Sequence, residues 1–107
     1  MVKASGNLFH PLPENRSKEV FEKLLEQESL LIERIVSFGQ ITPEGEWYDQ
    51  TTDEWVLMVQ GNGKILFEDN TVKTLKQGDY LFIPRHTKHR VIETSEDAIW
   101  LAVHIKN

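Results

Sequence analysis

The feature that most constrains the fold is a series of short apolar segments, each closed by a turn signal, over residues 29–105. Glycine-containing turns such as Gly61-Asn62-Gly63 and Gln77-Gly78-Asp79 recur at intervals of about ten residues, a spacing typical of all-β sandwiches and barrels. We therefore expect an antiparallel sheet folded into a sandwiched or closed barrel. The expected strands are 30–38, 54–60, 64–68, 71–75, 80–83, 89–94 and 98–105.

The N-terminal quarter of the chain has a different pattern. Ser17 is a suitable N-cap for a helix reaching to about Gln27, and Val20, Phe21, Leu24 and Leu25 fall on one stripe at helical spacing. The pattern predicts one short amphipathic helix that packs on the barrel. We accordingly divide the chain into a lead-in with this helix, residues 1–28, and a barrel domain, residues 29–107.

Composition narrows the classes of function. The chain has 107 residues, enough for one domain, and contains no cysteine, which excludes disulfides, thiolate nucleophiles and cysteine-ligated zinc. A formal net charge of −5, with dispersed lysines and arginines, argues against nucleic acid as a partner. No apolar run reaches the length of a membrane span, and the N-terminus lacks a signal-peptide core. We expect a cytoplasmic protein that binds a small molecule.

Four polar side chains in the barrel segment are candidates for a site. Tyr48 and Gln50 lie two residues apart, so they share a face if this segment is extended, and Glu54 opens the following strand. His89 follows the turn around Pro84, much further along the chain. We expect these side chains to converge at one end of the barrel, where an imidazole and a carboxylate together can bind a divalent metal.

The spacing of these residues resembles the motifs of the cupin superfamily. The first cupin motif has the form G-x5-H-x-H-x3-E-x6-G, and Glu54 and Gly61 match its end. Its leading glycine is missing, because Ile41 or Thr42 stands there, and Tyr48 and Gln50 replace its two histidines.

The second motif, G-x5-P-x-G-x2-H-x3-N, fits better. Gly78, Pro84 and His89 occupy their expected places, while His86 replaces the second glycine and Glu93 replaces the asparagine. The resemblance extends over residues 30–105, most of the chain.

The resemblance implies a cupin-like jelly-roll β-barrel with a ligand pocket, commonly a homodimer. It also implies a divalent metal ion such as zinc, iron, manganese or nickel. Glu54 and His89 correspond to the usual ligands, and Gln50 would contribute an amide oxygen. Tyr48 would be a proton donor or a phenolic ligand. Such a donor set differs from the two-histidine, one-carboxylate triad of iron oxygenases, so oxygenase chemistry is not the expected activity.

Three hypotheses follow for function. The first is a metal-binding cupin that binds a small carbonyl- or carboxylate-bearing molecule and performs Lewis-acid lyase or isomerase chemistry. The second is a metal-free binding or sensing module, in which the same side chains only form hydrogen bonds. The third is an assembly scaffold whose glycines and proline serve turns alone. The sequence does not decide whether Glu54 and His89 form only an ion pair, whether Tyr48 is only an aromatic wall, or which way His104 points.

Overall fold

Eight antiparallel strands form two sheets in the computed structural model, which describes residues 5–106. The seven strands expected after residue 29 are all present, with bounds within two residues of the prediction. The strands are β1 (Val20–Gln27), β2 (Leu30–Ser37), β3 (Asp53–Gln60), β4 (Asn62–Phe67), β5 (Val72–Lys76), β6 (Tyr80–Ile83), β7 (His89–Thr94) and β8 (Ala98–Ile105).

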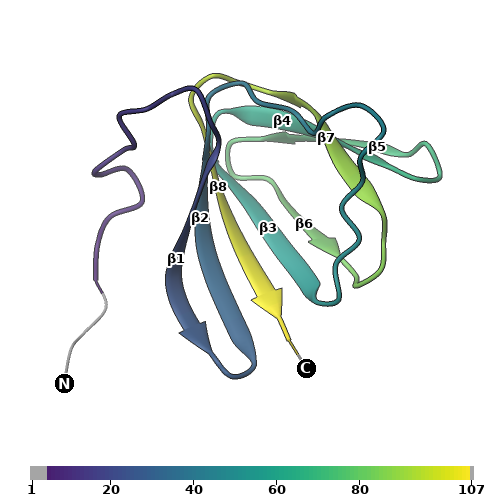
Figure 1. Ribbon diagram of the computed structural model, residues 1–107, viewed down its shortest axis with the longest axis horizontal. Coiled ribbons are helices and arrows are strands. Elements are labelled where there is room, and N and C mark those ends of the chain that lie inside the picture. The colour runs from purple at the N-terminus through teal and green to yellow at the C-terminus, as the bar shows by residue number, and fades with distance from the viewer. Residues whose placement is uncertain (1–4, 107) are drawn as a thin grey trace.

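The two sheets face one another across the core. One has five strands in the order β1-β2-β8-β3-β6, and the other has three in the order β5-β4-β7. Figure 1 shows the five-stranded sheet at the left and centre and the three-stranded sheet at the upper right. The expected all-β, cupin-like jelly-roll architecture is correct.

Alternation along the strands builds the core. On β3, Glu54, Val56 and Met58 are buried, while Trp55 and Leu57 between them face outward. Met58 lies opposite Trp100 of β8, and both belong to the main buried cluster. That cluster comprises Val56, Met58, Ile65, Leu75, Ile83, Ala98 and Trp100.

The predicted N-terminal helix is wrong. Val20–Gln27 is strand β1, which forms an antiparallel hairpin with β2 through the tight turn at residues 28–29. A β-bulge between Lys23 and Leu25 interrupts the register of this pair. The bulge breaks the two-residue alternation of side chains, so the apolar residues acquire a spacing close to that of a helix. On one side, the backbone of β1 forms hydrogen bonds with β2. The spacing of apolar residues in the sequence gives no information about such a partner.

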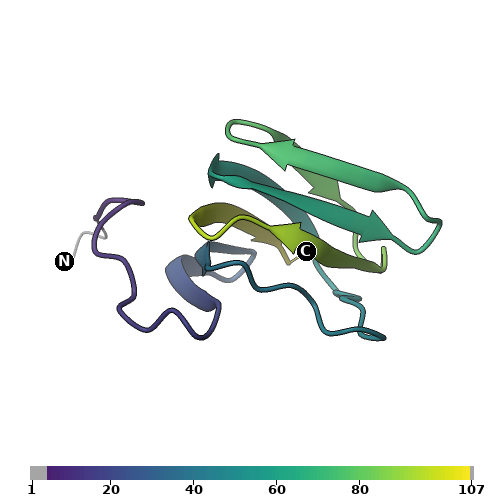
Figure 2. The same cartoon turned by 90° about the horizontal axis from the view of Figure 1, so that it is seen from above.

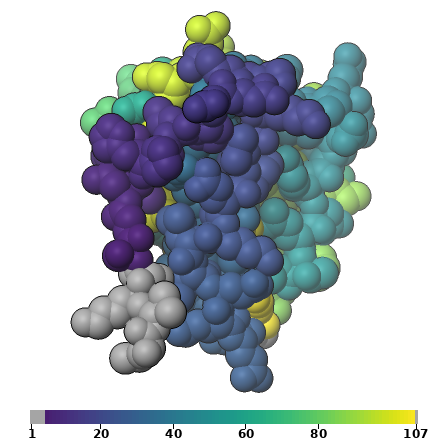
Figure 3. Space-filling view, turned by 60° about the vertical axis from the view of Figure 1, so that its left-hand side comes forward, coloured from purple at the N-terminus to yellow at the C-terminus, as the bar shows by residue number. Residues whose placement is uncertain are grey.

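The segment before β1 crosses the outer side of the hairpin, held by one buried arginine. Arg34 on β2 is 3% exposed, and its guanidinium donates to the carbonyl oxygens of Leu8 at 3.1 Å and Pro11 at 3.0 Å. It also pairs with Glu22 at 2.6 Å. Figures 2 and 3 show this segment lying outside the sandwich, beside β1.

Residues 5–106 include no helix of the length and hydropathy needed to cross a membrane.

Candidate functional site

A cavity of about 70 Å³ lies between the two sheets. Tyr48, Gln50, Glu54 and His89 all contribute to its lining, so the four candidate residues are brought together. Apolar side chains of the core, among them Val56 and Trp100, complete the walls. The cavity therefore combines a few polar groups with an apolar floor, as small-molecule sites commonly do.

Glu54 and His89 form the buried centre of the site, from opposite sheets. Their side chains are 10% and 7% exposed, and Nε2 of His89 lies 3.8 Å from Oε1 of Glu54. The carbonyl of Thr87 is 2.8 Å from Nδ1 of His89. Because a carbonyl can only accept, Nδ1 carries the proton in the neutral ring, and Nε2 presents its lone pair toward Glu54. A ring oriented in this way is prepared to act as a ligand or a base.

Tyr48 is held directly beside His89 by the backbone. The Tyr48 N–H donates to the His89 carbonyl at 2.8 Å, and the His89 N–H donates back at 3.1 Å. The two rings stack with centroids 5.6 Å apart. Burial, with further contributions from Glu19, Glu54 and Glu46, raises the pKa of the Tyr48 phenol. The phenol therefore stays protonated at neutral pH, which favours a role as a hydrogen-bond or proton donor over that of a phenolate ligand.

Gln50 contributes a buried amide oxygen that has no hydrogen-bond partner. Its backbone is fixed, since the Gln50 carbonyl accepts from the His86 N–H at 2.8 Å. An acceptor that is buried without a donor costs about 1 to 3 kcal/mol. This orphaned oxygen in the cavity wall thus requires a donor or a cation from outside the protein.

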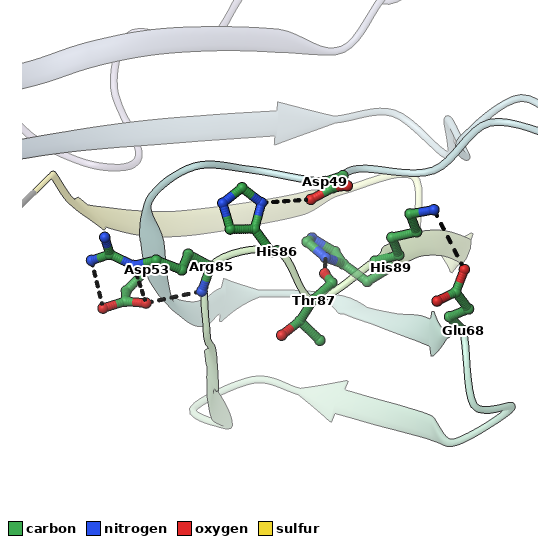
Figure 4. A network of polar contacts seen from close by, with 8 residues as sticks. Asp49, Asp53, Glu68, Arg85, His86, Thr87 and His89 are labelled. Carbon is green, nitrogen blue, oxygen red and sulfur yellow. Dashed lines mark hydrogen bonds and ion pairs between the residues drawn. The ribbon is translucent and has the colours of Figure 1, made fainter.

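The loop before β7, residues 84–88, leads directly into His89. His86, at the place of the second motif's glycine, has φ of 59°, a left-handed conformation that histidine tolerates better than most residues. Its exposed ring lies 3.2 Å from Asp49, and Arg85 pairs with Asp53 at 3.3 Å. Figure 4 shows these two contacts joining the loop to Asp49 before β3 and to Asp53 at the start of β3, with His89 beyond them. They position the loop rather than line the cavity.

Two further acidic residues and a histidine reach the cavity without having been predicted there. His104 on β8 lies opposite Glu54 in the register and pairs with Glu33 of β2, with 2.8 Å between Nε2 and Oε1. Glu19, just before β1, accepts a hydrogen bond from the Ser37 hydroxyl, and burial raises its pKa. Glu33 shares a strand face with Ile35, which packs against the core. This alternation along β2 could have predicted that the Glu33 side chain points inward.

The comparisons with known proteins agree with this architecture. The sequence profile of the family described as "Cupin domain" matches residues 36–104, more than half of the chain. The chain belongs to the cupin family. No curated protein matches this cupin significantly.

Several solved structures are similar to this cupin. One is a protein of Ralstonia eutropha JMP134 named "putative mannose-6-phosphate isomerase", with 44% identity and a TM-score of 0.90, covering 96% of this chain and 98% of its own. Another, an RmlC-like cupin of Desulfovibrio desulfuricans, has 20% identity and a TM-score of 0.80, with 98% of each chain covered. A cupin superfamily protein of Desulfitobacterium hafniense has 17% identity and a TM-score of 0.74, covering 100% and 99% of the two chains. The last two show the fold alone.

The donor set in this cupin fits a weakly held divalent ion. Two ligand atoms about 2.1 Å from one ion lie roughly 3 to 4 Å apart, and Glu54 and His89 are 3.8 Å apart. The orphaned oxygen of Gln50 supplies a third donor. Within residues 5–106, no three or more histidine, cysteine, aspartate or glutamate side chains form a metal-binding group. Any metal would therefore depend on an amide ligand, which binds less strongly than imidazole.

Burial raises the pKa of Glu54 above 4.5, with Glu33 adding to the rise and the two histidines, His104 and His89, opposing it. An acid with a raised folded-state pKa stabilises the fold fully below its unfolded pKa, and this contribution is lost as pH rises through the folded pKa. Glu54→Gln should therefore raise the free energy of unfolding at neutral pH, because the amide carries no charge that burial would penalise. Near pH 4 the parent and the variant should have the same free energy of unfolding, because the Glu54 carboxyl of the parent is then neutral like the amide that replaces it.

Urea unfolding at a series of pH values, in buffer with a chelator, measures this difference. Glu93→Gln is the matched control, because Glu93 is exposed and pairs only with Lys64 at 3.4 Å. A Glu54→Gln variant that is less stable than the parent at neutral pH would contradict the account.

Proposed function

We propose that this cupin binds a small carbonyl- or carboxylate-bearing molecule at the barrel mouth, beside a divalent metal ion held by Gln50, Glu54 and His89. The proposed chemistry is of the lyase or isomerase type. One observation carries the proposal: the unpaired amide oxygen of Gln50 lies in the same cavity as the Glu54–His89 pair. All three groups offer lone pairs to one small space, and zinc, iron, manganese and nickel all accept oxygen and nitrogen donors.

The chain's own residues have distinct roles in this proposal. A bound ion would supply Lewis-acid polarisation of a substrate oxygen. His89 is oriented by the Thr87 carbonyl at 2.8 Å, and Glu54 is kept beside it by the β3 backbone. Tyr48, stacked on His89 and half-buried, presents a protonated phenol to a ligand at the mouth. Proton donation from such a group is common in isomerase and lyase reactions.

The name of the Ralstonia neighbour supports the reaction type. That protein is named as an isomerase of a sugar phosphate, and it shares 44% identity with this chain. Isomerisation of a hydroxy-carbonyl compound needs a polarised carbonyl and a proton donor or acceptor. The cavity offers the residues for both tasks, which is why we favour isomerisation over redox chemistry.

Metal binding by purified, untagged protein tests the proposal. We expect about one zinc, iron, manganese or nickel ion per chain by elemental analysis, and one saturable zinc site by calorimetric titration. His89→Ala should weaken zinc binding at least tenfold, because imidazole is the strongest donor of the set. Gln50→His should strengthen it for the same reason.

The matched control is His86→Asn, which removes an exposed histidine at a position where asparagine tolerates the left-handed backbone. It should bind zinc as the parent does. Stoichiometric zinc in His89→Ala would show that the ion is held elsewhere. If the parent protein binds no zinc, the metal site is refuted and the second candidate function is favoured.

The second candidate is a metal-free binding module. It is favoured by the donor set, because no three histidine, cysteine, aspartate or glutamate side chains among residues 5–106 form a metal-binding group. In this function Gln50 and Glu54 accept hydrogen bonds from ligand hydroxyls, and Tyr48 donates one. Zinc bound at one ion per chain and lost in His89→Ala would exclude it.

We also propose that two copies of this cupin associate through the outer face of the five-stranded sheet. Trp55 and Leu57 lie opposite Phe82 and Tyr80 on that face, and the last two are 50% and 69% exposed. Strand β6, which carries these two, is an edge strand. Two identical chains cover one such surface reciprocally about a two-fold axis.

Phe82→Lys should shift the protein from dimer to monomer, because it inserts a charge into this apolar face. Light scattering coupled to size exclusion measures the change. Val72→Lys, at an equally exposed site on the other sheet, should leave the dimer intact. A parent protein that is monomeric at all concentrations would refute the association.

A further inference from the structure

The polar groups around the cavity are rich in acceptors and poor in positive charge. Three glutamates, Glu19, Glu33 and Glu54, line it together with Gln50, and none of the described lining residues is lysine or arginine. Each lining histidine already has a carboxylate beside it: His104 lies 2.8 Å from Glu33 and His89 lies 3.8 Å from Glu54. The wall therefore holds no excess of positive charge.

The acceptors in this wall are short of donors. The amide oxygen of Gln50 is buried and unpaired. The side chain of Glu54 is nine-tenths buried, and the 3.8 Å to His89 exceeds a hydrogen bond. A ligand that satisfies both groups must bring O–H or N–H donors with it. Hydroxyl groups suit this requirement, because each can donate to the wall and accept from Tyr48.

An anionic ligand would meet an unfavourable surface. Phosphates and carboxylates are usually bound by arginine, lysine or clustered N–H groups, whereas this wall carries three carboxylates. Two lysines line other surface grooves instead: Lys18 beside Thr42, and Lys106 beside Leu31. Lys106 is also engaged by Glu26 at 3.0 Å. Even with a divalent ion in place, the surrounding carboxylates would offset its charge.

The size of the cavity limits the ligand further. One water needs about 10 to 15 Å³ of such volume, so 70 Å³ corresponds to about five to seven water-sized positions. A hydroxy-carbonyl compound of about three carbons has about that many non-hydrogen atoms, whereas a hexose phosphate has roughly three times as many.

We propose that the cavity selects an uncharged, hydroxyl-bearing carbonyl compound of about three carbons, and discriminates against phosphorylated or carboxylated molecules. The inference rests on the proposed function, since it names the substrate class of the same site. The substrate class proposed here therefore differs from the sugar phosphate that appears in the name of the Ralstonia protein.

Nuclear magnetic resonance with a matched ligand series tests the proposal. Dihydroxyacetone, glycerate and glycerol phosphate share a three-carbon skeleton and differ in charge. The indole N–H of Trp100, which lines the cavity, is the reporter, and that of the exposed Trp47 is the internal control. We expect dihydroxyacetone to shift the Trp100 signal saturably, with dissociation constants at least tenfold higher for both anions. Equal or tighter binding of either anion would overturn the proposal, as would an unmoved Trp100 signal with dihydroxyacetone.

Two variants test the charge argument directly. Glu33→Gln removes one lining carboxylate, so it should strengthen glycerate binding several-fold and change dihydroxyacetone binding little. Glu93→Gln removes an exposed carboxylate outside the cavity and should change neither. A Glu33→Gln variant that binds glycerate no better than the parent would contradict a role for lining charge.

Repeating the titrations with chelator and with zinc separates this inference from the metal proposal. If dihydroxyacetone binds and zinc does not, the inference is supported and the proposed metal site is refuted. Zinc binding with anions preferred in its presence would support the metal site and overturn the inference.

Discussion

Trp100→Ala is expected to lower the free energy of unfolding by about 4 kcal/mol, the cost of removing a large aromatic side chain from a closed core. Trp100 is 3% exposed and lies opposite both Ile35 and Met58 in the five-stranded sheet. Its ring also reaches the other sheet, because a Cβ on Gly63 of β4 would lie 2.7 Å from two of its ring carbons. The indole thus joins the two sheets, and its removal would leave a cavity between them.

Urea or thermal unfolding measures the loss, with Trp47→Ala as the matched control. Trp47 is 38% exposed, and the guanidinium carbon of Arg90 lies 5.8 Å from the centroid of its ring. Removing the Trp47 side chain should therefore lower the free energy of unfolding by about 1 kcal/mol or less. Equal costs at the two positions would mean that Trp100 does not support the core as described. Because Trp100 also lines the cavity, the same variant should lose ligand binding.

Gly61→Ala is expected to lower the free energy of unfolding by about 3 kcal/mol through two combined effects. The first is conformational, since Gly61 has φ of 83°, where an L side chain is strained. The second is steric: an added Cβ would clash with Ser95 Oγ and lie 3.0 Å from the Ala98 Cα. Ser95 cannot move freely, because its Oγ accepts the Asn62 N–H at 3.0 Å.

Gly78→Ala separates these effects. Gly78 has φ of 91°, but an added Cβ would meet nothing within 4 Å. This variant should therefore cost only the conformational part, about 1 kcal/mol. Chemical unfolding of both variants measures the difference. If Gly61→Ala and Gly78→Ala are equally destabilised, close packing around Gly61 contributes nothing.

These glycines show why the strand pattern was predictable. A position that needs a positive φ strongly favours glycine, so Gly61 and Gly78 mark the turns before β4 and β6 in the sequence itself. Between turns, short apolar runs such as residues 54–60 indicate strands, and the structure has β3 at Asp53–Gln60. Both signals are local, and both predictions were confirmed.

The N-terminal element was mispredicted because its signal is not local. In β1 the bulge near Lys23 places the apolar side chains at a spacing that also suits a helix. What decides the structure is the backbone pairing with β2, which runs from Val20 to Gln27 and satisfies the donors and acceptors that face β2. Helix propensity is a weak preference beside such pairing.

The candidate site was predictable in part. Motif spacing led to Glu54 and His89, and the pairing of Tyr48 with His89 across an isolated bridge brings the remaining two candidates to the same cavity. Their roles in metal binding and proton transfer stay predictions. His104 is different, since Trp100 and Leu101 of the same strand point to opposite faces and are both apolar. Alternation therefore gave no direction for its side chain.

The sequence alone determined the seven strands after residue 29, the turns between them, and which of their side chains share a strand face, because glycine conformation and two-residue alternation act between near neighbours. Only the tertiary structure decided that residues 20–27 form a strand, that His104 and Glu33 pair inside the cavity, and that no lysine or arginine among the described residues lines it. These features depend on which strands lie side by side. That choice is made by packing and hydrogen bonds between segments far apart in the chain, such as β2 and β8.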